Sequence, residues 1–119
     1  MRVESYKNLI VWQKAMDLVT AVYRITANFP REEIYGLSSQ IKRAAVSIPS
    51  NIAEGSRRSS KKDFRNFLLV AFGSGSELET QLEIAKRLSF VTPNDSALAE
   101  NLLSEVMKMI NKLSDSMNA

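Results

Sequence analysis

The sequence contains no cysteine and no histidine. Without cysteine the chain cannot form a disulfide and has neither a thiolate nucleophile nor a cysteine ligand for a metal, which fits a reducing cytoplasm. Without histidine it also lacks the commonest general base and the commonest metal ligand. Only carboxylates, lysines and hydroxyls remain for chemistry, so we expect no enzymatic activity, no metal and no cofactor.

Long apolar runs are also missing. No run approaches the roughly 20 apolar residues that span a bilayer, and the apolar patch at residues 9–12 ends at Gln13. We therefore expect no signal peptide, no membrane anchor and a cytoplasmic protein. The chain has 119 residues, of which 45% are hydrophobic and 24% charged, as is usual for a folded globular protein. We expect a single domain over residues 1–119.

The net charge of +3 is distributed unevenly along the chain. Residues 1–65 contain 12 Lys and Arg against 6 Asp and Glu, whereas residues 66–119 contain 4 against 7. Such a polarised distribution favours an anionic partner at one face. The densest basic run places five cations within nine positions: Arg57, Arg58, Lys61, Lys62 and Arg65.

Apolar residues recur every three or four positions in four segments, and this spacing predicts four helices. The stripes are Leu9–Phe29, Gly36–Ile52, Phe64–Ala85 and Ala99–Met117. Four helices of about 20 to 28 residues with short connections predict an all-α fold, an up-down-up-down antiparallel four-helix bundle. No strand pattern or internal repeat interrupts the chain.

Pro49 lies inside the second segment, yet the apolar residues keep their phase on both sides of it. This predicts one continuous helix, kinked because Pro49 removes the hydrogen bond to the Ala45 carbonyl. Gly55 stands where a C-terminal cap is expected. Ser59 or Ser60 is predicted to cap the start of the third helix.

The stretch AFGSGSE at residues 71–77 has two glycines, each of which costs about 1 kcal/mol in a helix relative to alanine. The apolar register agrees on both sides of it, so we expect the third helix to continue through the stretch and to pack closely there. The glycines do not form a dinucleotide-binding fingerprint, because Leu78 replaces the third glycine and no strand precedes them.

The first helix carries two apolar stripes, more than one seam of a bundle needs. One contains Val11, Ala15, Leu18, Val22, Ile25 and Phe29. For the other we expect packing in the core or, more specifically, an oligomer interface with another copy of the chain; it contains Leu9, Trp12, Met16, Val19 and Tyr23. A stacking platform for bases would instead need exposed aromatic rings beside cations.

Acidic residues on the third helix raise the question of a metal site. Glu77, Glu79 and Glu83 could supply carboxylates, but di-iron bundles use Glu-x-x-His motifs and this chain has no histidine. Glu83 is also spaced to pair with Lys86 and Arg87 on a solvated face. We therefore expect ion pairs there, with no metal.

Several stretches, taken together, resemble the bacterial four-helix-bundle family of 23S rRNA-intervening-sequence proteins, also labelled ribosomal proteins. They are LIVWQKAMDL, FP, YGLSSQIKRAAVSIPSNIAEGS and FLLVAFGSGSELETQL, spanning about residues 7–88. The resemblance implies a homopentamer shaped as a short barrel or ring, without enzymatic activity. For relatives in diversity-generating retroelements, it implies binding to nucleic acid and to a reverse transcriptase.

The basic run has two interpretations: a solvated turn, or a contact for RNA or DNA. Our leading hypothesis is a homo-oligomer that binds nucleic-acid phosphates, because five copies of +3 would carry +15. The expected contacts are Arg57, Arg58, Lys61, Lys62 and Arg65, with Lys42 and Arg43 less favoured; few exposed aromatics are expected beside them. The alternative is a structural adaptor that recruits a protein partner. Convergence of the basic run with the N-terminal basic residues would favour nucleic acid.

Overall fold

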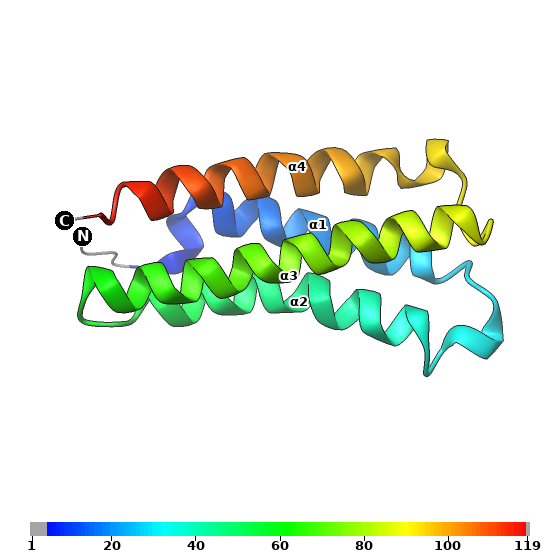
Figure 1. The fold of residues 1–119 in the computed structure, drawn as a ribbon, viewed down its shortest axis with the longest axis horizontal. Coiled ribbons are helices and arrows are strands. Elements are labelled where there is room, and N and C mark those ends of the chain that lie inside the picture. The colour runs from blue at the N-terminus through cyan, green and yellow to red at the C-terminus, as the bar shows by residue number, and fades with distance from the viewer. Residues whose placement is uncertain (1–4, 119) are drawn as a thin grey trace.

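Four long helices form an antiparallel bundle in the computed structural model, which describes residues 5–118 (Figure 1). The helices are α1 (Ile10–Thr26), α2 (Leu37–Ser56), α3 (Lys61–Arg87) and α4 (Pro93–Asp115). Two single-turn 3-10 helices accompany them, η1 (Tyr6–Asn8) before α1 and η2 (Arg31–Glu33) between α1 and α2. The described residues contain no strand, and the predicted all-α, up-down-up-down bundle is confirmed.

Each helix packs against its two neighbours around the bundle. Close backbone contacts join α1 to α2, α2 to α3, α3 to α4, and α4 back to α1, and the α2–α3 pair is the most closely packed. Neither diagonal pair of helices has such contacts within residues 5–118. The start of α1, the end of α4 and the α2–α3 turn lie at one end of the bundle, hereafter the terminal end (Figure 1).

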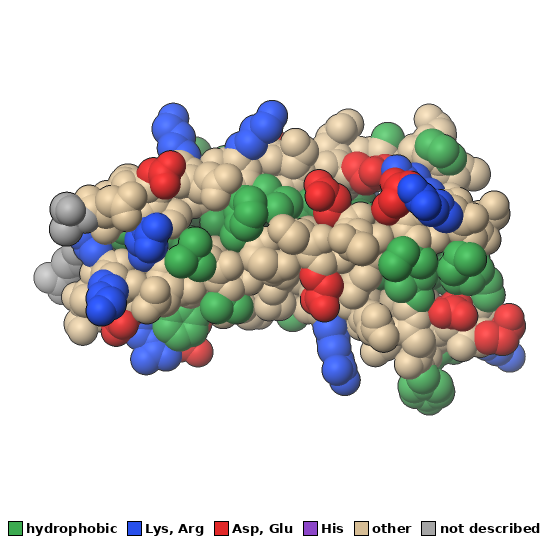
Figure 2. All heavy atoms as spheres, viewed as in Figure 1, with side chains coloured by type: hydrophobic (Ala, Val, Ile, Leu, Met, Phe, Trp, Pro, Cys, Tyr) green, Lys and Arg blue, Asp and Glu red, His purple; other side chains and the backbone are tan. Residues whose placement is uncertain are grey.

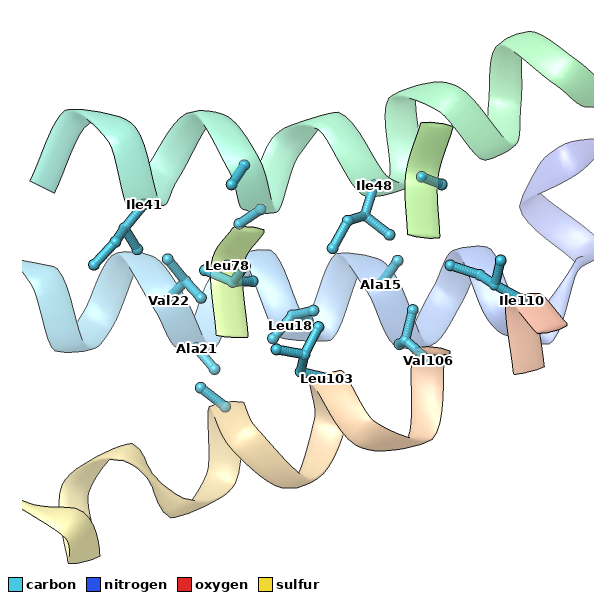
Figure 3. Packing of buried hydrophobic residues seen from close by; sticks show 14 of the residues in the cluster. Ala15, Leu18, Ala21, Val22, Ile41, Ile48, Leu78, Leu103, Val106 and Ile110 are labelled. Carbon is cyan, nitrogen blue, oxygen red and sulfur yellow. The ribbon is translucent and has the colours of Figure 1, made fainter. Parts of the chain in front are cut away.

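The core is built from the predicted apolar stripes. Figure 3 shows Leu18 of α1, Ile48 of α2, Leu78 of α3 and Leu103 of α4 meeting between the helices. All four side chains are at most 2% exposed. Burial of a side chain of this size contributes about 1.5 to 3 kcal/mol. This shared core fixes the outward direction of every other side chain on the four helices.

Two helices continue through residues that often break helices, as the apolar register predicted. α2 runs without interruption through Pro49, which is itself buried. α3 runs through the glycine-containing stretch at 71–77, and Gly75 is buried there against Met107 of α4. The apolar phase is the stronger determinant in both cases, because the packed face on either side of the break offsets the local cost.

The start of α3 follows the predicted cap. The Ser60 hydroxyl accepts a hydrogen bond from the backbone N–H of Asp63, at 3.1 Å. Thr92 caps α4 in the same way by accepting from the N–H of Asp95 at 3.0 Å, and Pro93 occupies the first turn. These side-chain oxygens satisfy backbone donors that have no partner inside the helix.

The predicted role of Gly55 as a C-terminal cap is wrong. α2 continues to Ser56, its capping residue is Arg57, and no glycine in the described residues has a positive φ. Gly55 is buried where α2 meets α3. A Cβ atom there would lie 2.7 Å from Cβ of Phe67 and 3.0 Å from Cδ1 of Phe64. The glycine is therefore needed for close helix packing, which a local sequence pattern cannot distinguish from capping.

Candidate nucleic-acid and self-association surfaces

The structure brings the five predicted phosphate contacts together at the terminal end. We call Arg57, Arg58, Lys61, Lys62 and Arg65 the basic turn, because they lie on the α2–α3 connection and the first turns of α3. The first four are exposed and Arg65 is half-buried. Their proximity follows from sequence alone, since all five lie within nine consecutive positions.

The cations of the basic turn differ in their partners. Arg58 pairs with Glu54 one turn earlier in α2, at 3.4 Å, and such an exposed pair contributes at most about 1 kcal/mol. Among the described residues, Arg57, Lys61 and Lys62 take part in no ion pair. These three charges are therefore available to an anionic partner.

Two aromatic rings lie beneath the arginines of the basic turn. The Arg57 guanidinium lies 5.4 Å from the ring centroid of Tyr6, and that of Arg58 lies 4.8 Å from the ring centroid of Phe67. Both rings are half-buried. At a partly exposed site, each such cation–π contact stabilises the arginine in this position by about 0.5 to 1 kcal/mol. The sequence did not suggest them, because η1 and α3 supply the rings.

Charge is separated along the length of the bundle. If each helix is divided at its midpoint, the terminal-end half of residues 5–118 holds nine Lys and Arg against five Asp and Glu. The other half holds six against seven, so the two net charges are +4 and −1. Figure 2 shows this difference on one face, with basic side chains over the terminal end and more acidic side chains toward the opposite end.

The remaining predicted cations are only partly brought to the basic turn. Lys7 lies at the terminal end in η1, and Lys14 follows in α1, where it pairs with Glu105 at 3.3 Å. Lys42 and Arg43 lie near the start of α2, roughly 20 Å from the basic turn at 1.5 Å per residue. The structure therefore places Lys7 and Lys14 in the same half of the bundle as the basic turn, with Lys14 directed to α4, and leaves Lys42 and Arg43 apart from it.

An apolar groove lies between α1 and α2. This α1–α2 groove has a volume of about 320 Å³ and is lined by Tyr6, Trp12, Met16, Val19, Val46, Pro49, Ser50 and Ala53. Tyr6 packs edge-on against Trp12, with ring centroids 5.3 Å apart, at the terminal end of the groove. At the other end Lys42 lies over Tyr23, 5.1 Å from the ring centroid.

The two apolar stripes of α1 separate as predicted into different surroundings. The stripe that begins at Val11 enters the core, whereas Trp12, Met16 and Val19 line the groove and Tyr23 is exposed beyond it. Leu9 lies apart from these, half-buried beside α4. The interface itself stays a prediction, since residues 5–118 of a single chain are described.

Sequence reasoning missed the α2 side of this groove. Val46, Pro49 and Ala53 recur at steps of three and four, and Lys42 precedes them by four. That spacing could have revealed a second stripe on α2 beside the buried one. Pro49 obscures this stripe, because a proline inside a helical pattern first indicates a break or kink.

Glu83 of α3 forms the predicted ion pairs. Glu83 pairs with Arg87 at 3.1 Å and with Lys86 at 3.4 Å, and these cations hold the pKa of Glu83 below its usual value. Lys86 also binds Glu100 of α4 at 2.8 Å and lowers the pKa of that carboxyl, while Glu100 raises the pKa of Lys86. The described residues contain no group of three potential metal ligands.

None of the helices in residues 5–118 combines the length and the apolar character needed to cross a membrane.

The fold and the two surfaces define the chain as a small four-helix-bundle protein with two exposed features, a basic turn and an apolar groove. The family model described as 23S rRNA-intervening sequence protein matches residues 7–112. The protein belongs to this family, and the match extends the resemblance seen in its first three helices into the fourth.

A solved structure has the same fold. It is a protein of unknown function from the S23 ribosomal protein family of Bacteroides thetaiotaomicron, with a TM-score of 0.79 and 26% sequence identity. The similarity covers 88% of this chain and 98% of that one. No curated protein matches the chain.

Proposed function

We propose that this protein is a non-enzymatic, cytoplasmic, nucleic-acid-binding accessory protein that assembles as a homo-oligomer of five copies. The supporting observation is the concentration of positive charge at the terminal end, where Arg57, Lys61 and Lys62 are exposed and without ion-pair partners among the described residues. Nucleic-acid phosphates are the partner that such a surface favours, and RNA and DNA both supply them.

Self-association supports this binding through repetition. Each copy has a net charge of +3, so five copies have +15. Individually weak phosphate contacts act together when several copies engage one strand. The apolar groove, with Met16 and Val46 about 40% exposed, supplies a surface that association would remove from water. The number five comes from the family resemblance and is tested by light scattering coupled to size exclusion.

The test of binding is a salt series with matched variants. We compare wild type with a variant in which Arg57, Lys61 and Lys62 are changed to alanine, using mixed-sequence RNA and DNA. Wild type should bind with an affinity that falls steeply as salt rises. The logarithm of the binding constant falls linearly with the logarithm of the salt concentration. Each lost phosphate contact should reduce the steepness of this line by about 0.9 on duplex DNA and about 0.7 on single strands.

The matched control removes the same charge from the opposite half. Arg24, Arg31 and Arg43 are exposed and take part in no ion pair within residues 5–118, and changing them to alanine should leave the slope nearly unchanged. Absence of wild-type binding even at low salt would refute nucleic-acid binding. Equal losses in both variants would show that net charge matters and that the basic turn does not.

A second candidate function is a structural adaptor that recruits a protein partner. The α1–α2 groove favours it, because seven of its eight lining residues are aromatic, aliphatic or proline. Under this alternative the protein would not bind nucleic acid, and the basic turn would be a solvated connection. The salt series therefore distinguishes the two functions directly.

A further inference from the structure

The outward side of α3 carries an apolar patch. Leu69 is 47% exposed and Val70 is 54% exposed. Gly73 lies one turn further along, and a Cβ atom built there would meet nothing within 4 Å. Glu77 follows after another turn and takes part in no ion pair within residues 5–118. We call these four residues the α3 outer face; it combines exposed apolar side chains with room for a close approach.

The level of this face along the bundle follows from contacts between α2 and α3. Ser47 and Ser74 share a hydrogen bond of 2.8 Å, so these two residues lie at the same level. The two helices are antiparallel, and each step along α2 is therefore matched by a step back along α3. Leu69 and Val70 are then level with the stretch of α2 near Ile52.

That level coincides with the α1–α2 groove, whose lining on α2 runs from Val46 to Ala53. By the same relation, Glu77 is level with Ala44 and so lies within one turn of the height of Lys42. The apolar patch matches the groove in height, and the free carboxylate matches the cation at the end of the groove. The two surfaces nevertheless lie on different sides of one protomer.

We propose that the α1–α2 groove of one protomer receives Leu69 and Val70 of a second copy, with the two bundle axes pointing in the same direction. This inference rests on the proposed self-association and specifies its interface. Glu77 of the entering copy then faces Lys42, and Gly73 allows the helices to approach. The groove volume of about 320 Å³, equal to about ten waters at 30 Å³ each, accommodates these two aliphatic side chains.

A second copy of the chain fits this groove for three reasons. The apolar patch lies at the height of the groove, Gly73 leaves room for a close approach, and Glu77 lies near the height of Lys42. The interface joins two different surfaces, so it is heterologous. α3 lies diagonally across the bundle from α1, hence the groove and the α3 outer face are neither on the same side nor directly opposed. A contact of this kind that is repeated about an axis parallel to the bundles generates a ring when the rotation between copies closes.

This arrangement has a consequence for binding. Protomers that point in the same direction present every basic turn on one rim of the ring. An antiparallel, face-to-face dimer would instead place the two basic turns at opposite ends. The parallel arrangement therefore makes a continuous cationic rim for a polyanion.

Engineered cysteines test the interface cleanly, because the native chain has none. Ser50→Cys, in the groove, and Val70→Cys, on the α3 outer face, are made in separate chains of different mass, which are mixed and oxidised. Any disulfide between the two is intermolecular by construction. The control pairs Ser50→Cys with Ser104→Cys, an exposed position midway along α4. We expect the first pair to give at least tenfold more mixed disulfide than the control.

Charge reversal gives an independent measurement. Glu77→Lys places two cations face to face at the proposed contact, so the oligomer should dissociate to lower mass by light scattering. Lys42→Glu should do the same, and the double variant should recover the wild-type mass. If the double variant recovers the wild-type mass, the two residues pair with each other. A folding defect in either single variant would not be repaired in this way.

The outcomes separate this interface from self-association itself. A monomeric wild type overturns both. An oligomer that gives no more mixed disulfide than the control overturns the interface and leaves self-association standing. Preferential Ser50→Cys homodimers would show face-to-face packing of two grooves, which also overturns the heterologous ring.

Discussion

Gly55 is the position where one added methyl group should cost the most. In Gly55→Ala the new Cβ would lie 2.7 Å from Cβ of Phe67 and 3.3 Å from the Phe64 carbonyl oxygen. Both atoms are fixed to the α3 backbone, so the helices must separate. Overpacking of this kind costs about 1 to 3 kcal/mol, and the gain in helix propensity offsets about 1 kcal/mol of it. We expect a net loss of up to about 2 kcal/mol.

Gly75→Ala is the matched control, since Gly75 is also buried inside a helix. Its new Cβ would lie 3.0 Å from Sδ and 3.1 Å from Cγ of Met107. The methionine side chain is flexible and can move at small cost. The propensity gain then dominates, and we expect a change between zero and about 1 kcal/mol of stabilisation.

The assay is urea unfolding followed by far-UV circular dichroism, with all variants at one protein concentration because association shifts apparent stability. The Gly55→Ala midpoint should fall while that of Gly75→Ala should hold or rise. If Gly55→Ala is as stable as wild type, the close packing of α2 on α3 is not what requires glycine there.

Two further predictions concern a cap and a carboxylate. Ser60→Ala should destabilise the protein by about 1 kcal/mol through loss of the α3 cap, whereas Ser59→Ala should have little effect; equal effects in urea unfolding would contradict the capping role. The pKa of Glu100 is lowered in the folded state, first by Lys86, so its contribution is present above the unfolded pKa and disappears as pH falls through the folded value. In Glu100→Gln the free energy of unfolding should therefore fall less than in wild type as the pH drops below about 4. The same fall in both proteins would contradict this.

The helices could be predicted from the sequence because their cause is local. Apolar residues at three- and four-residue steps need one buried face, and this requirement holds through Pro49 and through the stretch at 71–77. The basic turn was also evident, because its five cations are neighbours in the chain. Of the two predicted caps, Ser60 was correct because capping depends on neighbouring residues. Gly55 was wrong because the glycine is required by its contacts with Phe64 and Phe67 of α3.

The sequence by itself therefore determined four helices, a bundle and a cluster of positive charge, all of which depend on spacing along one segment. Only the tertiary structure decided that Gly55 is a packing contact and that Trp12 and Val46 share one groove. Those features depend on which residues of different helices lie at the same height. The packed core sets that height, and it arises from contacts between residues distant in the chain.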